Sequence, residues 1–244
     1  MTLIVVCAVI LVVCLLCAAV PLAFADFSRR RPLGWPLTTA LCGLLLTTFV
    51  LRDLLRKRRL ARVRRDFDRW QATSGWIPGR VDRIWPWTNH IRAPGMVTVT
   101  FAFDRDLGGL PVTVGELSWI DDGLGDATDR WKGRGIFTVV RLPGSPPDFA
   151  VRRYRTVYRQ RAGEDEFRRR FRTIFNDTVN ADRLDHEELR KAHVNNEIPP
   201  WTLLDGELFT IVSMDEPTTP AAMESAASDA LRVAELIGLR SSSA

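Results

Sequence analysis

Residues 33–51 read LGWPLTTALCGLLLTTFVL, and residues 52–70 follow directly with RDLLRKRRLARVRRDFDRW. The first run holds nineteen residues without a charge, close to the about 20 that a helix needs to cross the ~30 Å hydrocarbon core of a bilayer. The second run carries nine cations and three acidic residues, and such basic clusters mark the cytoplasmic end of a span. The pair predicts a transmembrane helix over 33–51 that ends at a basic cytoplasmic flank.

A second apolar segment precedes this one, over residues 2–25. It lacks the basic start of a signal peptide, and its apolar run exceeds the usual ~7–15 residues of a signal core. We therefore expect a first membrane span here. The connector over 26–32, DFSRRRP, is short, so residues 1–51 are predicted to form a transmembrane hairpin with both chain ends on one side.

The larger basic cluster sets the predicted orientation of this hairpin. Arginine and lysine stay inside, so both termini are expected in the cytoplasm of a multi-pass inner-membrane protein. The bias of the cations toward arginine, with only three lysines among 34, favours a bacterial source. The membrane-flanking cations include Arg56, Lys57, Arg58, Arg59, Arg62, Arg64 and Arg65.

Residues 52–72 are predicted to form a basic juxtamembrane helix. Leu60, Val63, Phe67 and Trp70 are spaced 3, 4 and 3 residues apart, which places them on one helical stripe among the arginines. The stripe has three interpretations. It lies on anionic inner-leaflet lipids, it pairs with a second copy, or it packs on the chain's own folded domain.

Charge and cysteine content narrow the classes of partner and site. The net charge of +5 arises in the flank, because residues 71–244 sum to about −3, and we therefore expect no nucleic-acid partner. All four cysteines lie in the two apolar segments, which excludes disulfides and thiolate metal sites from the remaining chain. We expect no cofactor.

The remaining chain, residues 73–244, predicts an α+β domain with a mixed, mainly antiparallel sheet. Alternating apolar residues favour strands over Met96–Asp104, Gly135–Leu142 and Phe149–Arg161, with a looser alternation over 79–85. Asp205-Gly206 is typical of a two-residue hairpin turn and joins strands expected at 202–204 and 207–214. One side of this sheet is expected to face water.

Helical patterns complete the domain. Asp185–Val194 predicts a helix with Asp185 as N-cap, and Thr219–Leu239 predicts a long C-terminal helix. Glu166–Asn176 suits either a helix or a strand. The domain is expected to be a single unit or two halves meeting near Gly163.

No pattern assigns catalytic, cofactor-binding or metal-binding residues, and whether the protein is an enzyme stays open. His90 lies in a loop without a recognisable nucleophile or orienting carboxylate nearby, and His186 and His193 are expected to face solvent on a helix. The acidic loop of Asp121, Asp122, Asp126 and Asp129 lacks the spacing of an EF-hand, and Gly133 and Gly135 precede a strand rather than a helix.

A basic face is the remaining candidate site. Residues 152–172 hold nine arginines against three acidic residues. Alternation places four of the arginines on the face of Val151, where they are predicted to contact headgroups or an acidic partner: Arg153, Arg155, Arg159 and Arg161. Alternatively, they pair with the domain's own carboxylates.

Four short segments of the sequence, taken in their order along the chain, carry a resemblance to a known family. They are VVRLPGSPPDFAVRR (139–153), EFRRRFRTIFND (166–177), LDHEELRKA (184–192) and WTLLDGELFTIV (201–212). With the apolar hairpin before them, they resemble a group of uncharacterised two-span actinobacterial membrane proteins that carry a C-terminal cytoplasmic α+β domain. The resemblance implies this architecture, and it implies no activity and no catalytic residues.

Together these observations predict a membrane-tethered binding or scaffold module that recruits an unidentified protein partner. The alternative is a membrane-associated hydrolase or transferase acting on a lipid-derived substrate. A deep pocket joining His90 to carboxylates would favour the enzyme, whereas an open arginine face would favour the binding module.

Overall fold

The computed structural model describes residues 34–88, 96–144, 146–154, 165–175 and 186–239. The chain divides into two compact units, Met1–Arg65 and Asp66–Ala244. The span predicted over 2–25 lies outside the described residues. Helix α2 (Gly34–Ser74) covers the second apolar run and the predicted basic helix. Among the helices of the described ranges, none meets the length and apolarity required of a membrane span, so the predicted spans remain predictions.

The C-terminal end of α2 belongs to the second unit and packs against its hydrophobic core. The Phe67 ring lies 5.4 Å from the Phe101 ring, and the Trp70 ring lies 5.2 Å from the Phe103 ring. Of the three interpretations of the apolar stripe, Phe67 and Trp70 therefore follow the third, which is packing on the chain's own domain. The folded unit begins at Asp66, before the boundary of 73 predicted from composition.

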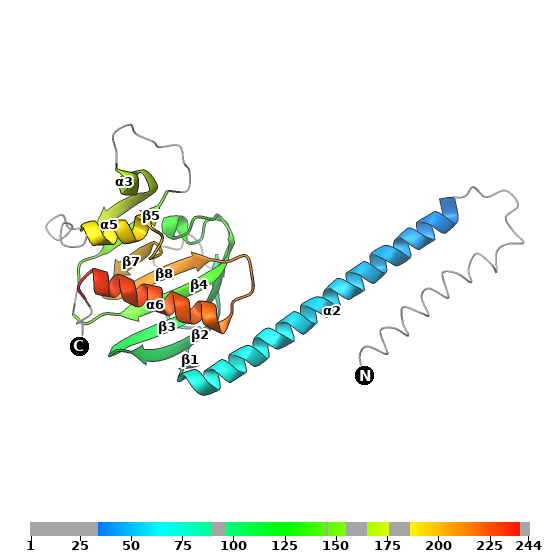
Figure 1. The fold of residues 1–244 in the computed structure, drawn as a ribbon, viewed down its shortest axis with the longest axis horizontal. Helices are drawn as coiled ribbons and strands as arrows, with labels where there is room; N and C mark the ends of the chain where they lie inside the picture. Colours follow the sequence, from blue (N-terminus) through cyan, green and yellow to red (C-terminus); the bar gives the residue numbers. More distant parts are fainter. Residues whose placement is uncertain (1–33, 89–95, 145, 155–164, 176–185, 240–244) are drawn as a thin grey trace, which may run out of the picture. The chain divides into compact units, whose positions relative to one another are not determined.

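In the described residues the second unit is built on one antiparallel sheet of eight strands, in the order β1-β2-β3-β4-β8-β7-β5-β6. The expected α+β class, antiparallel pairing and C-terminal helix are confirmed (Figure 1). Strands from both sides of Gly163 join the sheet, so the two-halves alternative is wrong. The strands are β1 (Ile77–Pro78), β2 (Val97–Leu107), β3 (Leu110–Trp119), β4 (Gly133–Arg141), β5 (Phe149–Arg153), β6 (Phe171–Phe175), β7 (Trp201–Leu204) and β8 (Glu207–Ser213).

Two tight hairpins set the register of this sheet. Asp205 and Gly206 have φ of 50° and 77° and join β7 to β8, as the sequence predicts for a turn with two positive φ values. Gly108 and Gly109, with φ of 63° and 81°, join β2 to β3 in the same way. Neither this second hairpin nor β3 was predicted from the sequence.

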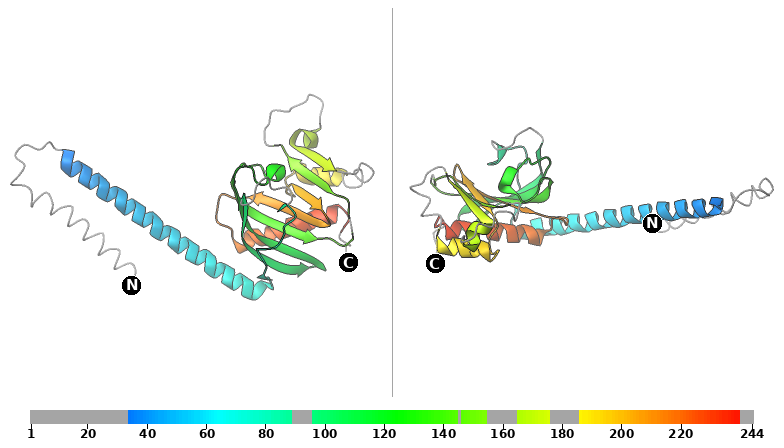
Figure 2. Two further views of the ribbon diagram at one scale, coloured as in Figure 1. Left: turned by 180° about the vertical axis from the view of Figure 1, so that it is seen from behind. Right: turned by 90° about the horizontal axis from the view of Figure 1, so that it is seen from above.

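Both faces of the sheet are covered, so the prediction of one wetted side is wrong. Helices α5 (Glu187–Val194) and α6 (Pro220–Leu236) lie on one face, and the segment with the short helix η3 (Gly125–Ala127) lies on the other (Figure 2). On this second face Trp85 and Trp87 stack on each other and contact the Phe137 ring. The irregular segment 79–88 supplies these tryptophans and forms no strand.

Two local predictions in this part of the chain are wrong, and one open alternative is resolved. β5 ends at Arg153, and residues 155–164 lie outside the described residues. The ambiguous segment holds both structures, because α3 (Glu166–Arg170) runs directly into β6. Helix α5 takes His186 as its N-cap residue rather than Asp185, whereas α6 begins after Thr219, whose side chain accepts a hydrogen bond from the Ala222 amide.

Candidate functional site

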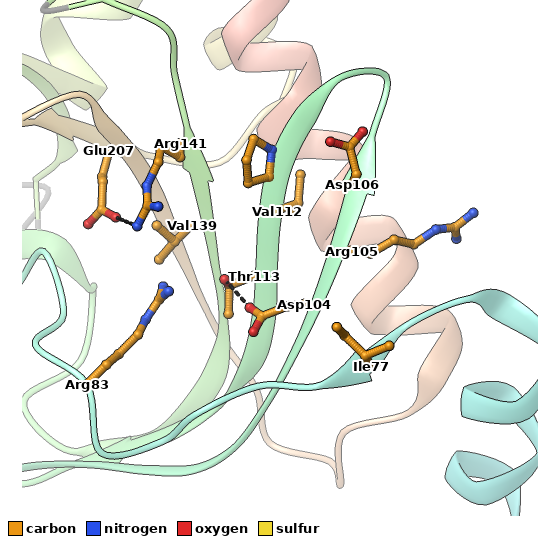
Figure 3. A pocket seen from close by; sticks show the side chains of 11 residues that line it. Ile77, Arg83, Asp104, Arg105, Asp106, Val112, Thr113, Val139, Arg141 and Glu207 are labelled. Carbon is orange, nitrogen blue, oxygen red and sulfur yellow. Dashed lines mark hydrogen bonds and ion pairs between the residues drawn. The ribbon is translucent and has the colours of Figure 1, made fainter.

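An open pocket of about 320 Å³ lies where β2, β3, β4 and β8 come together with the segment 79–88 (Figure 3). Its charged lining comes from distant parts of the chain, and strand pairing brings all of it together except Arg83. Arg141 at the end of β4 faces Glu207 at the start of β8 in register, and Asp104 of β2 faces Thr113 of β3. The volume falls in the range of small-ligand sites.

One end of the pocket carries two guanidinium groups and one carboxylate. Arg141 Nη2 lies 3.2 Å from Glu207 Oε1. The Arg83 side chain reaches toward this pair from segment 79–88 (Figure 3), and its guanidinium carbon lies 4.1 Å from the centre of the Trp85 ring. Burial lowers the pKa of Arg83, with Glu207 and Asp104 opposing that shift and Arg141 adding to it.

Arg83 is the least satisfied charged group of this end. Its Nε atom is buried and finds no hydrogen-bond acceptor among the residues that the structure describes. A guanidinium group has five N–H donors in a fixed fork that fits oxyanions. Arg83 therefore lines the pocket, beside the Arg141–Glu207 pair, with a guanidinium group whose donors are not all used by the described residues.

The other end of the pocket carries acidic side chains. The Thr113 hydroxyl donates a hydrogen bond to Asp104 Oδ1, which fixes that carboxylate, and Gly79 leaves room for its second oxygen, because a Cβ there would lie 2.8 Å from Asp104 Oδ2. Asp106 also lines the pocket and accepts a hydrogen bond from the Gly109 amide. Arg105 points away from the arginine end (Figure 3) and lies 4.0 Å from Glu224.

The pocket is therefore dipolar. Arg83 and Arg141 outweigh Glu207 at one end, while Asp104 and Asp106 carry negative charge at the other. Such an arrangement can orient a ligand that has an acidic group and a basic group. Each end of the pocket attracts the ligand group of opposite charge and repels the group of like charge.

The predicted basic face lies only partly in the described residues. Arg153 is exposed at the end of β5, whereas Arg155, Arg159 and Arg161 lie outside the described ranges. Arg152, which alternation placed on the opposite face, is buried against β7 with its Nη1 donating to the Trp201 carbonyl. Three arginines of α3 and β6 are exposed as well, and they extend the basic cluster: Arg168, Arg169 and Arg172.

The cations predicted to flank a membrane lie on α2. The side chains of Arg58, Arg62, Arg64 and Arg65 are exposed. The side chains of three others, Arg56, Lys57 and Arg59, lie outside what the structure describes.

The histidines do not converge on a site. His193 is fully buried, which corrects the solvent-facing prediction, and its Nε2 accepts a hydrogen bond from Trp201 Nε1 at 3.1 Å. His186 Nε2 lies 2.6 Å from the Leu236 carbonyl oxygen, and His90 lies outside the described residues. Within the described ranges, no cluster of three or more histidine, cysteine and acidic residues could hold a metal ion.

Sequence reasoning missed every charged residue of the pocket. The available signals were weak: Asp104 interrupts an alternating apolar strand, and Arg141 and Glu207 stand at the ends of two predicted strands. Which strands become neighbours decides the site, and β4 pairs with β8 across more than sixty residues. Local patterns do not carry that information.

Comparisons with protein families, curated proteins and solved structures find no match to this chain.

Proposed function

We propose that the chain is a membrane-tethered cytoplasmic module that recruits an acidic protein partner. One observation carries the proposal: α2 is a single helix from Gly34 to Ser74. This helix contains most of the apolar run, all of the basic flank, and Phe67 and Trp70, which are partly buried and pack against the core of the folded domain. A tether and a folded domain thus share one element.

The sequence of the helix supports the membrane attachment. Nineteen uncharged residues precede nine cations, and each exposed arginine near an anionic leaflet contributes about 1 kcal/mol of attraction. The exposed arginines of the flank therefore contact anionic lipids of the inner leaflet. These arginines are Arg58, Arg62, Arg64 and Arg65.

The arginines around β5, α3 and β6 support the recruitment of a partner. Arg153, Arg168, Arg169 and Arg172 are exposed on a part of the chain whose net charge is negative. The ion pair of Arg168 with Asp165 is long, 3.7 Å, and exposed, and exposed pairs are worth only ~0–1 kcal/mol. The exposed side chains of Arg153, Arg168 and Arg169 can therefore also contact an acidic surface.

Affinity purification of the tagged full-length protein from detergent-solubilised native membranes tests the proposal. We expect one stoichiometric partner, which is lost when Arg153 and Arg169, both exposed, are changed to Glu. Arg80→Glu with Arg232→Glu serves as the matched control, because both arginines are exposed and lie outside the cluster. A partner retained equally by both variants, or no partner at all, would contradict the recruiting role.

A further inference from the structure

We propose that the pocket between Arg83 and Asp104 binds a small zwitterion made of a singly charged phosphodiester and a primary ammonium group. The site lies entirely within residues 66–244, and this inference does not depend on the tether or on the arginine cluster of the proposed function. The chemistry is that of an ethanolamine phosphodiester, whether as a lipid headgroup or as a free soluble molecule.

The arginine end selects the phosphodiester. Arg83 approaches from segment 79–88 and Arg141 from the end of β4 (Figure 3), so two guanidinium groups meet the same space from different elements. A phosphodiester carries its single negative charge on two non-bridging oxygens, and each guanidinium group can donate to one of them. Arg83 lines the pocket, and a guanidinium fork can donate to the oxygens of such an anion.

The surrounding charge limits the anion to one negative charge. Glu207 lies 3.2 Å from Arg141, so it neutralises part of the positive charge at this end. A doubly charged phosphate monoester would be repelled by Glu207 and by Asp104. A diester keeps a single charge and avoids this repulsion.

The acidic end selects the ammonium group. Asp104 is held by the Thr113 hydroxyl through Oδ1, which fixes the position of its second oxygen beside Gly79. A primary ammonium group can donate hydrogen bonds to that oxygen. A trimethylated ammonium group has no N–H and cannot.

The size of the pocket agrees with such a ligand. About 320 Å³ is at the lower limit of the ~300–1,000 Å³ found for small-molecule sites. A phosphodiester headgroup fits this volume. The pocket is also open, and a headgroup that carries further substituents could enter it.

Calorimetric titration of the purified full-length protein in maltoside micelles tests the proposal, with glycerophosphoethanolamine as the probe. We expect saturable binding at one site. Glycerophosphocholine, which differs by three N-methyl groups, and inorganic phosphate should each bind about tenfold more weakly or worse, because each lacks one of the two interactions.

Two variants assign the binding to this pocket. Arg83→Gln should weaken binding of glycerophosphoethanolamine by about tenfold or more, whereas Arg80→Gln, in the same segment but exposed and paired with Asp82, should leave it unchanged. Asp104→Asn still accepts the Thr113 hydrogen bond and should remove the preference for ethanolamine over choline. This second variant keeps the test informative if Arg83→Gln disturbs the fold.

The titrations distinguish a lipid headgroup from a free soluble ligand, and they also include results that would overturn the proposal. Tighter binding of short-chain phosphatidylethanolamine than of glycerophosphoethanolamine identifies a lipid headgroup, and the reverse order identifies a free soluble ligand. No saturable binding of either probe overturns the proposal. Equal binding of the ethanolamine and choline compounds, or equal losses in Arg83→Gln and Arg80→Gln, overturns it as well.

Discussion

His193 shows how a single residue can make the stability of this domain depend on pH. Its side chain is fully buried, and its ring centre lies 5.0 Å from that of Phe171 and 5.8 Å from that of Phe167. Nε2 accepts the Trp201 hydrogen bond, and Nδ1 is buried without a partner among the described residues. Burial disfavours the imidazolium form and lowers the pKa of His193 to about 4.

The direction of the pH effect follows from this shift. In the unfolded chain the pKa of histidine is about 6.5, so between pH 6.5 and 4 the unfolded state binds a proton that the folded state does not. Above pH 6.5 the titration of His193 does not change the free energy of unfolding. As the pH falls from 6.5 to 4, the free energy of unfolding should decrease by about 1.4 kcal/mol per pH unit, to a total loss of roughly 3 kcal/mol.

Denaturant unfolding of the full-length protein in micelles across this range checks the prediction. His193→Gln should flatten the slope between pH 6.5 and 4, because its amide oxygen can accept from Trp201 and does not titrate. His186→Gln, at the start of the same helix, should keep the wild-type slope. A slope that His193→Gln leaves unchanged would contradict the assignment.

At the scale of elements, one carboxylate joins the end of α2 to α6. Glu224 Oε1 accepts hydrogen bonds from Trp70 Nε1 and from Trp76 Nε1, each at 2.9 Å. The two tryptophan rings stack with centroids 5.6 Å apart. The entry of α2 into the domain core therefore depends on a polar contact as well as on apolar packing.

Glu224→Ala should lower the free energy of unfolding by about 2 kcal/mol or more, because it leaves two part-buried indole N–H groups without their acceptor. Glu224→Gln retains a carbonyl acceptor and should cost less. The control is Glu235→Ala, which removes an exposed ion pair with Arg232 on the same helix and should change stability by less than about 0.5 kcal/mol. Equal losses in the Glu224→Ala and Glu235→Ala proteins would refute the role of the contact.

The elements that could be predicted from the sequence are those with a strong local signal. The alternation of β2 and the Asp205-Gly206 turn are both local, and both predictions are confirmed. β3 was missed because Pro111 and Gly115 weaken its pattern. Gly115 is required by packing, since a Cβ there would collide with the Phe101 carbonyl oxygen and the Phe137 ring.

The spacing of apolar residues alone could not decide between helix and strand for the segment from Glu166 to Phe175. Phe167 and Phe171 are both buried and stack with ring centroids 5.4 Å apart, yet one lies in α3 and the other begins β6. The change of structure occurs because β6 pairs with β5, and this partner is not visible in the local sequence.

At the scale of the whole molecule, the class of the folded unit follows from the sequence, but its binding surfaces do not. The α+β class and the C-terminal helix are confirmed. The second layer on the sheet was not predicted, because Trp85 and Trp87 lie in an irregular segment whose contacts to Phe137 and Phe209 are long-range. The pocket with Arg83 belongs to that same layer.

Membrane attachment is also a property of the whole molecule, and its prediction depends on the sequence of residues 1–70. Two apolar runs with a basic flank predict an integral membrane protein. The recruiting role needs this attachment, whereas the ligand pocket within residues 66–244 does not. The two proposals can therefore fail separately.

Alkaline carbonate extraction of native membranes, followed by flotation of the pellet in a density gradient, tests the central claim most directly. The full-length protein is predicted to resist extraction and to float with lipid, while a chain that begins at Arg52 is released into the supernatant. Release of the full-length protein by carbonate would contradict the account, because a chain held only by the arginines of its flank would be freed in this way.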